Sequence, residues 1–235
     1  MHINSISIII IGFNTKNYLK NLLESINNLK IDPLNQIIEV VYIDDGSNDH
    51  SLSLFKNFNL TLKKTCFGFK KNKGRVYATN KGISIASGNW LLFLQSNMVV
   101  DSNLVLEYYK AITATRAVAV GGKIIYDSKD KSFEKYLNAK KRGVNQYKQY
   151  DIMNYQNLLF GNCIIQKDIF KEIKLNLRLK GYGGEELDFA YRLNRQYSQQ
   201  IIACNSAIAY RINHPRLMQH ILRIEEFGKY NFCLL

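Results

Sequence analysis

Short, uninterrupted apolar runs alternate with helical patterns through the first hundred residues, and this rhythm limits the fold more than any other feature of the chain. The strand candidates are residues 6–11, 40–43, 60–62 and 90–94, and the helical patterns between them cover residues 19–26 and 76–86. Strands that are apolar on both faces are typical of a mostly parallel sheet covered by helices on both sides. A chain of 235 residues is long enough to bury such a core as one domain. The sequence therefore predicts a single α/β domain over residues 1–235.

Two of the strand candidates run directly into polar clusters. Asp44-Asp45-Gly46-Ser47 follows the strand 40–43, and Gln95-Ser96-Asn97 follows the strand 90–94. Ligands of parallel α/β sheets bind beyond the carboxyl ends of the strands, so these side chains are candidate binding residues. The first cluster has two interpretations: a strand-to-helix turn with a helix cap, or a carboxylate that accepts hydrogen bonds from a base or a ribose. Neither a Gly-x-Gly-x-x-Gly fingerprint nor a P-loop is present.

A glycine-rich turn, residues 181–184, delivers two adjacent carboxylates onto the first turn of an amphipathic helix. Glu186 shares the apolar, inward-facing stripe of this helix, whereas Glu185 shares the stripe of Asp188 and Arg192. Burial raises the pKa of a carboxyl and the positive end of a helix lowers it, so Glu186 is expected to be ionised yet basic enough to deprotonate an alcohol. The alternative is an ordinary acidic helix start with a surface ion pair between Asp188 and Arg192.

The formal net charge of +13 indicates an anionic partner, such as nucleotide phosphates, acidic lipid headgroups or nucleic acid. Nucleic acid is not expected, because the lysines are spread along the chain without a finger, recognition-helix or aromatic-platform signature. No apolar stretch reaches the roughly 20 residues needed to span a bilayer. The scattered cysteines fit a reducing compartment. The sequence therefore predicts a cytoplasmic protein, either soluble or peripheral at the membrane.

The stretch 216–229 has the pattern of a further amphipathic helix. Leu217, Ile221 and Ile224 share one stripe, with Arg223 and Lys229 nearby. Such a helix packs on the core in one interpretation and rests on an anionic membrane surface in the other.

Together these segments resemble the inverting nucleotide-sugar glycosyltransferases of family 2, which have the Rossmann-like GT-A fold. The resemblance covers nearly the whole chain. Residues 9–14, Ile-Ile-Ile-Gly-Phe-Asn, are similar to the family's opening strand, and Val41 to Ser47 is similar to its second-strand motif. Asn72-x-Gly74, Ala78-x-Asn80-x-Gly82 and Ala86-x-Gly88 are similar to the helix before the strand that normally ends in Asp-x-Asp. Residues 161–192 resemble the acceptor half, and Gly183-Gly184-Glu185-Glu186 resembles the Gly-Gly-Glu-Asp segment of galactosyltransferase C-terminal modules.

The resemblance implies that a nucleotide-diphosphate sugar binds to residues 1–100 and that an acceptor binds to residues 101–235, which end in a C-terminal helix. The implied donor-binding residues are Gly12, Phe13, Asn14, Asp44, Asp45, Asn72, Arg75, Gln95, Ser96 and Asn97, with Asn72 and Arg75 on the diphosphate side. The implied acceptor-binding residues are Gly183, Gly184 and Glu185. Glu186 takes the position of the family's catalytic Asp, which removes the proton of the acceptor hydroxyl. The expected reaction moves a hexose or N-acetylhexosamine to a saccharide or lipid-linked saccharide, in the assembly of bacterial surface polysaccharide.

The sequence departs from this family at its metal site. Where relatives bind Mg²⁺ or Mn²⁺ through Asp-x-Asp, Gln95-Ser96-Asn97 offers neutral amides, and hard divalent cations prefer carboxylate oxygens. One alternative is Mn²⁺ carried chiefly by the diphosphate, with Asn97 and His214 as further ligands. The other is neutralisation of the diphosphate without a metal by Arg75, Arg211, Arg216 or nearby lysines. A noncatalytic relative that binds a nucleotide sugar or a glycan is the alternative to an enzyme.

Overall fold

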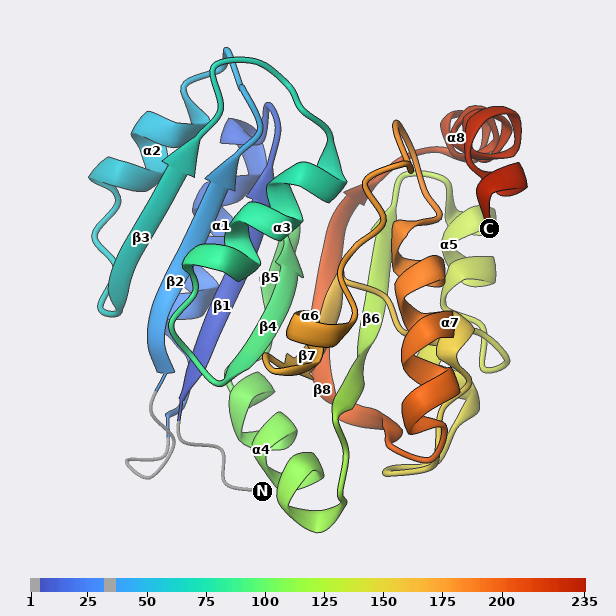
Figure 1. The fold of residues 1–235 in the computed structure, drawn as a ribbon. Coiled ribbons are helices and arrows are strands. Elements are labelled where there is room, and N and C mark those ends of the chain that lie inside the picture. The colour runs from blue at the N-terminus through green and yellow to red at the C-terminus, as the bar shows by residue number, and fades with distance from the viewer. Residues whose placement is uncertain (1–4, 32–36) are drawn as a thin grey trace.

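One sheet runs through the computed structural model, which describes residues 5–31 and 37–235 (Figure 1). Within these residues it has eight strands, in the order β3-β2-β1-β4-β7-β6-β8-β5. They are β1 (Ile6–Gly12), β2 (Ile37–Asp44), β3 (Lys63–Gly68), β4 (Trp90–Gln95), β5 (Met98–Val100), β6 (Ala119–Ser128), β7 (Asn162–Gln166) and β8 (Ile201–His214). The strands from β3 to β4 are parallel, as are β6 and β8, whereas β7 is antiparallel to both its neighbours and β5 is antiparallel to β8. The predicted α/β domain with a mostly parallel sheet is confirmed.

Helices cover both faces of this sheet (Figure 1). They are α1 (Lys16–Asn27), α2 (Ser51–Asn57), α3 (Arg75–Ile85), α4 (Leu104–Ala114), α5 (Lys131–Leu137), α6 (Ile169–Glu172), α7 (Glu185–Tyr197) and α8 (Leu217–Tyr230), with 3-10 turns at Gly143–Gln146, Tyr155–Asn157 and Phe232–Leu234. Side chains alternate between the faces of a strand, so Ile8 and Ile10 of β1 join a first core with α1, α2 and α4. Ile9 joins a second core with α3, α6 and α7. The continuous apolar runs arise because both faces of the sheet are buried.

The strand expected at residues 60–62 is wrong, because the third strand along the chain is β3, Lys63–Gly68. β3 lies at the edge of the sheet and most of its side chains are exposed, so its sequence lacks the apolar run that marks the central strands. Leu60 and Leu62 lie in the loop before β3, where they pack against the first core.

The carboxyl ends of the central strands lie at one edge and bring the two polar clusters together. Gly12 at the end of β1 pairs with Asp44, and Ile11 pairs with Gln95. The chain then enters β5, whose Met98 pairs with Arg211 of β8. The end of β8, from the second half of the chain, therefore lies beside the turn that follows β4.

Candidate active site

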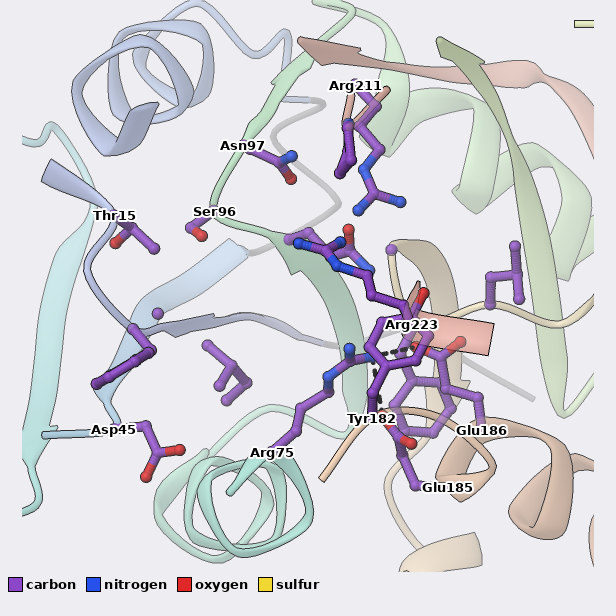
Figure 2. A pocket seen from close by; sticks show the side chains of 18 of the residues that line it. Thr15, Asp45, Arg75, Ser96, Asn97, Tyr182, Glu185, Glu186, Arg211 and Arg223 are labelled. Atoms are coloured by element: carbon purple, nitrogen blue, oxygen red, sulfur yellow. Dashed lines mark ion pairs between the residues drawn. The ribbon is translucent and has the colours of Figure 1, made fainter. Parts of the chain in front are cut away.

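A cleft of about 1370 Å³ opens at the carboxyl ends of β1 and β4. Its lining includes the β1–α1 turn, the loop before α3, the turn after β4, the glycine-rich loop before α7, and the stretch from the end of β8 into α8. Figure 2 shows side chains from these segments converging on one space. Of the site residues predicted from the sequence, Asp44, Gly183 and Gly184 do not line the cleft, and all the others do.

The turn from β1 into α1 is fixed by the turn that follows β2. The N–H of Asn14 donates to Ser47 Oγ at 2.8 Å, and the Asn14 side-chain oxygen accepts from the N–H of Asn48 at 3.0 Å. A Cβ at position 12 would lie 2.3 Å from the Tyr42 hydroxyl oxygen, so only glycine fits there. The glycine therefore lets Tyr42 and Thr15 pack closely against the end of β1.

The two adjacent aspartates after β2 have different surroundings. Asp44 accepts hydrogen bonds from the N–H of Ser47 at 2.9 Å and from the Tyr42 hydroxyl at 3.4 Å, which is the turn arrangement of the first interpretation. Asp45 faces the cleft and accepts from the N–H groups of Lys73 at 2.8 Å and Gly74 at 2.9 Å. Burial raises the pKa of Asp45 more than these two hydrogen bonds lower it. Asp45 thus anchors the loop that leads into α3.

Both glutamates at the start of α7 face the guanidinium group of Arg75. Gly184, with a left-handed φ of 95°, turns the chain into the helix. Arg75 Nη1 lies 2.8 Å from Glu185 Oε1 and 3.6 Å from Glu186 Oε1 (Figure 2). Glu185 is only 3% exposed, so the stripe that it shares with Asp188 and Arg192 does not face solvent at this residue. Helical periodicity describes a helix alone, whereas the surroundings of this first turn are set by Arg75 from α3.

Glu186 has the surroundings of a general base. Burial is the largest effect and raises the pKa of its carboxyl, the charge of Arg75 opposes this, and the charge of Glu185 adds to it, which leaves a pKa of about 7. A carboxylate of that pKa is about half ionised at neutral pH and is a stronger base than a solvated one. The surface pair also forms, with Arg192 Nε donating to Asp188 Oδ2 at 3.2 Å. The surface pair of the second interpretation is therefore present, and it does not involve Glu186.

Tyr182 of the glycine-rich loop contacts two arginines. Arg75 Cζ and Arg223 Cζ lie 5.6 Å and 5.5 Å from the centre of the Tyr182 ring, within the range of cation–π attraction. The resemblance places Arg75 on the diphosphate side, but in the structure its charge faces the two glutamates. The sequence pattern placed Arg223 near the apolar stripe of α8, and in the structure this side chain lines the cleft.

The glycine-rich loop is held by residues from the C-terminal part of the chain. Asn231, only 2% exposed, donates from Nδ2 to the carbonyl oxygens of Lys180 and Gly183, both at 2.7 Å, and accepts from the N–H of Lys180 at 3.2 Å. Glu226 Oε1 accepts from the N–H of Tyr182 at 3.2 Å. These residues were missed in the sequence, since no local pattern signals a contact across about fifty residues of chain.

The residues expected to hold a metal do not form a cation site. Gln95, Ser96 and Asn97 line the cleft with neutral oxygens. His214 is 7% exposed, packs edge-on against Tyr126, and lies with Nδ1 3.0 Å from the carbonyl oxygen of Pro215. Burial and the charge of a neighbouring arginine lower the pKa of His214 to about 4. Within residues 5–31 and 37–235, no three His, Cys, Asp or Glu side chains gather around a possible ion. A hard divalent cation does not fit this donor set.

Cationic side chains make up much of the remaining lining. They are Lys73, Lys129, Arg142, Lys180, Arg211, Arg216 and Arg223, in addition to Arg75. Burial lowers the pKa of the Arg211 guanidinium. The acidic residues of the lining are Asp45, Glu185, Glu186 and Glu226, and each of them already contacts Arg75 or a backbone N–H. The rest of the cleft is therefore suited to an anion.

The family model described as Glycosyl transferase family 2 matches residues 7–174. Glycosyltransferase GlyG from Streptococcus pneumoniae is 29% identical over 176 residues, which are 73% of this chain and 57% of that protein. Glycosyltransferase GlyA from the same organism is 25% identical over 226 residues, which are 91% of this chain and 31% of that protein. The chain thus spans only part of the length of these relatives.

Solved structures share the fold. The structure of Staphylococcus aureus TarS residues 1–349 in complex with UDP-GlcNAc has a TM-score of 0.70 and 17% identity, over 92% of this chain and 60% of that one. The mannosyltransferase PcManGT from Pyrobaculum calidifontis, in complex with GDP-Man and Mn²⁺, has a TM-score of 0.66 and 14% identity, over 94% of this chain and 60% of that one. At such identities the likeness shows the fold alone. The family match ends before α7, so Glu186 is assigned from its geometry.

Proposed function

The chain belongs to glycosyl transferase family 2, and from that premise we propose that it moves a hexose or N-acetylhexosamine from a nucleotide-diphosphate sugar to a saccharide or lipid-linked saccharide, with inversion at the anomeric carbon. The observation that carries the proposal is Glu186, a carboxylate with a pKa of about 7 that faces the same cleft as the carboxyl ends of β1 and β4. The donor half and the base therefore meet in one space.

The transfer is a single displacement. The acceptor hydroxyl oxygen forms a bond to the anomeric carbon while its proton passes to Glu186. The bond from that carbon to the phosphate oxygen breaks on the opposite face, and its electron pair stays on the diphosphate. A base with a pKa near the working pH is best placed for such a proton transfer.

Glu185 has a different role from its neighbour. The resemblance implies that it binds the acceptor, but it is almost fully buried and lies closer to Arg75 than Glu186 does. We assign it to holding the Arg75 guanidinium in place beside Glu186. Arg75 in turn limits how far burial raises the pKa of Glu186.

The nucleotide is assigned to the turn after β1 and the loop before α3. Phe13 is 49% exposed at the cleft and offers a face for a base, and Asn72 lies beside the loop anchored by Asp45.

We further propose that the protein acts in surface polysaccharide assembly and rests at the inner face of the cytoplasmic membrane. No helix in the described parts of the chain is long and apolar enough to cross a bilayer. α8 exposes Leu217, Met218, Ile221, Leu222 and Ile224 and buries none of its residues, so packing on the core does not account for its apolar stripe. Its basic residues are engaged elsewhere, since Arg223 faces the cleft and Lys229 pairs with Glu225 at 2.7 Å. Sedimentation with anionic vesicles, compared between the parent and a variant with Met218→Ser and Leu222→Ser, tests this placement; equal sedimentation would contradict it.

The transfer proposal is tested with a panel of UDP- and GDP-linked hexoses and N-acetylhexosamines. Nucleotide release is followed with water or a saccharide as acceptor, and the anomeric configuration of the product is read by NMR. We expect turnover of at least one donor with inverted configuration. A donor that binds tightly while none is turned over would favour the noncatalytic alternative, and a retained configuration would refute the single displacement.

A further inference from the structure

Two arginines, Arg211 and Arg223, line the cleft, and the charge of Arg211 reaches Glu186, whose pKa it lowers. In the part of the chain that the structure describes, neither Arg211 nor Arg223 forms an ion pair with a carboxylate. Arg211 Nε is buried and has no hydrogen-bond partner. A buried donor without a partner is costly, and two nearby cations repel each other. An anion bound to both would stabilise this arrangement.

The fold places Arg211 beside the residues that replace Asp-x-Asp. Its strand neighbours are Met98 of β5 and Tyr126 of β6, and the N–H of Ile212 donates to the carbonyl oxygen of Asn97 at 3.1 Å. Figure 2 shows the guanidinium of Arg211 next to Asn97 and pointing into the cleft, toward Arg223. The positive charges therefore lie beside the position where a metal ion would neutralise the leaving group in relatives that bind one.

Arg75 is not available for the same task. Its guanidinium is 2.8 Å from Glu185 and 3.6 Å from Glu186, so its charge is already balanced. Arg223 reaches the cleft from α8 across the ring of Tyr182, on which Arg75 also lies. Planar guanidinium groups bind phosphate oxygens through paired hydrogen bonds, so two of them match a diphosphate.

We propose that Arg211 and Arg223 bind the diphosphate of the donor and neutralise the charge that it gains when the bond to the sugar breaks, in place of a divalent cation. The electron pair of the breaking bond stays on the phosphate oxygen, which accepts hydrogen bonds from the two guanidinium groups, while the proton of the acceptor passes to Glu186. Preorganised cations at a developing charge are an established means of lowering a reaction barrier. The inference rests on the proposed nucleotide-diphosphate donor.

Calorimetric binding of UDP and of GDP in the presence of EDTA tests the site directly. We expect the parent to bind one of them, and Arg211→Ala and Arg223→Ala each to weaken that binding by about 10- to 100-fold, which is the usual loss for a hydrogen bond to a charged group. Arg116→Ala, an exposed arginine outside the cleft, serves as the matched control and should bind as the parent does. Arg223 lies on a helix with no buried residue, so its replacement leaves the core intact even if Arg211→Ala unfolds.

Three results would overturn the proposal: a parent that binds neither nucleotide in EDTA, binding that appears only after Mn²⁺ is added, or unchanged affinity in both arginine variants. These outcomes are separate from the fate of the proposed reaction. Turnover that requires Mn²⁺ would leave the transfer standing and remove the arginine site. Nucleotide binding in EDTA that depends on the two arginines, without turnover of any donor, would keep the arginine site and remove the proposed transfer.

Discussion

Replacing Arg75 with glutamine should move the pH dependence of the reaction. Arg75 Nη1 is 3.6 Å from Glu186 Oε1, and its positive charge lowers the pKa of that carboxyl. Without the charge, the proton on Glu186 is held more tightly. The acidic limb of the pH profile, which reports ionisation of the base, should then shift to higher pH.

The size of the shift follows from the distance. Two unit charges at 3.6 Å interact by about 5 kcal/mol at an effective dielectric constant near 20, equivalent to about three pKa units. The side chain of Arg75 is 36% exposed and is shared with Glu185, so solvent screening reduces this to about one or two units. From a starting pKa of about 7, kcat/KM at pH 7 should fall about five- to fiftyfold and recover above pH 9.

The assay is kcat/KM for hydrolysis of a nucleotide sugar that the parent turns over, measured from pH 5 to pH 10 for the parent, Arg75→Gln and Arg75→Lys. The lysine variant keeps the charge, so its acidic limb should lie closer to that of the parent. Thermal unfolding at pH 7 checks that each variant is folded. An acidic limb that stays in place, or moves to lower pH, in folded Arg75→Gln would refute the coupling between Arg75 and Glu186.

Three further substitutions test how the site is built. Asn231→Ala removes the donor to the carbonyl oxygens of Lys180 and Gly183 in the glycine-rich loop. We expect kcat to fall at least about tenfold while UDP affinity is unchanged. An unchanged kcat would show that the loop keeps its conformation without Asn231. Gly184→Ala places a Cβ on a residue with φ of 95° and 3.0 Å from the Phe227 ring, so Tm should drop by about 2–8 °C. Gly228→Ala, whose Cβ would meet no atom within 4 Å, is its matched control, and an equal drop in both variants would contradict the strain argument. Asp45→Ala releases the N–H groups of Lys73 and Gly74, so UDP should bind more weakly in calorimetry, and equal affinity would remove the loop before α3 from the donor site.

The sheet was predictable because its central strands are buried on both faces. Ile6–Gly12 and Trp90–Gln95 are apolar apart from Ser7 and Gln95, and this pattern can be read from the sequence alone. The edge strand Lys63–Gly68 was missed because exposure at the sheet edge removes that pattern. The apolar pattern is therefore lost where the faces of a strand are exposed to solvent.

The acidic turn before α7 was recognisable, but the partners of its side chains were not. Periodicity placed Glu185 on the stripe of Asp188 and Arg192, and the structure buries it against Arg75 of α3, more than a hundred residues away in sequence. Arg223 and Asn231 follow the same rule, since each acts on a segment about forty or fifty residues earlier in the chain. The sequence indicated candidate site residues, whereas the contacts that balance their charges and position them came only from the three-dimensional structure.

The most direct test of the central claim compares Glu186→Gln with Asp188→Asn, a carboxylate of the same helix turn that pairs with Arg192. Turnover of the preferred donor is measured at pH 8, alongside calorimetric binding of UDP. We predict that Glu186→Gln lowers kcat by about 10²- to 10⁴-fold while UDP affinity is kept, and that Asp188→Asn stays within a few-fold of the parent. A Glu186→Gln variant that turns over the donor as fast as Asp188→Asn would contradict the assignment of Glu186 as the base.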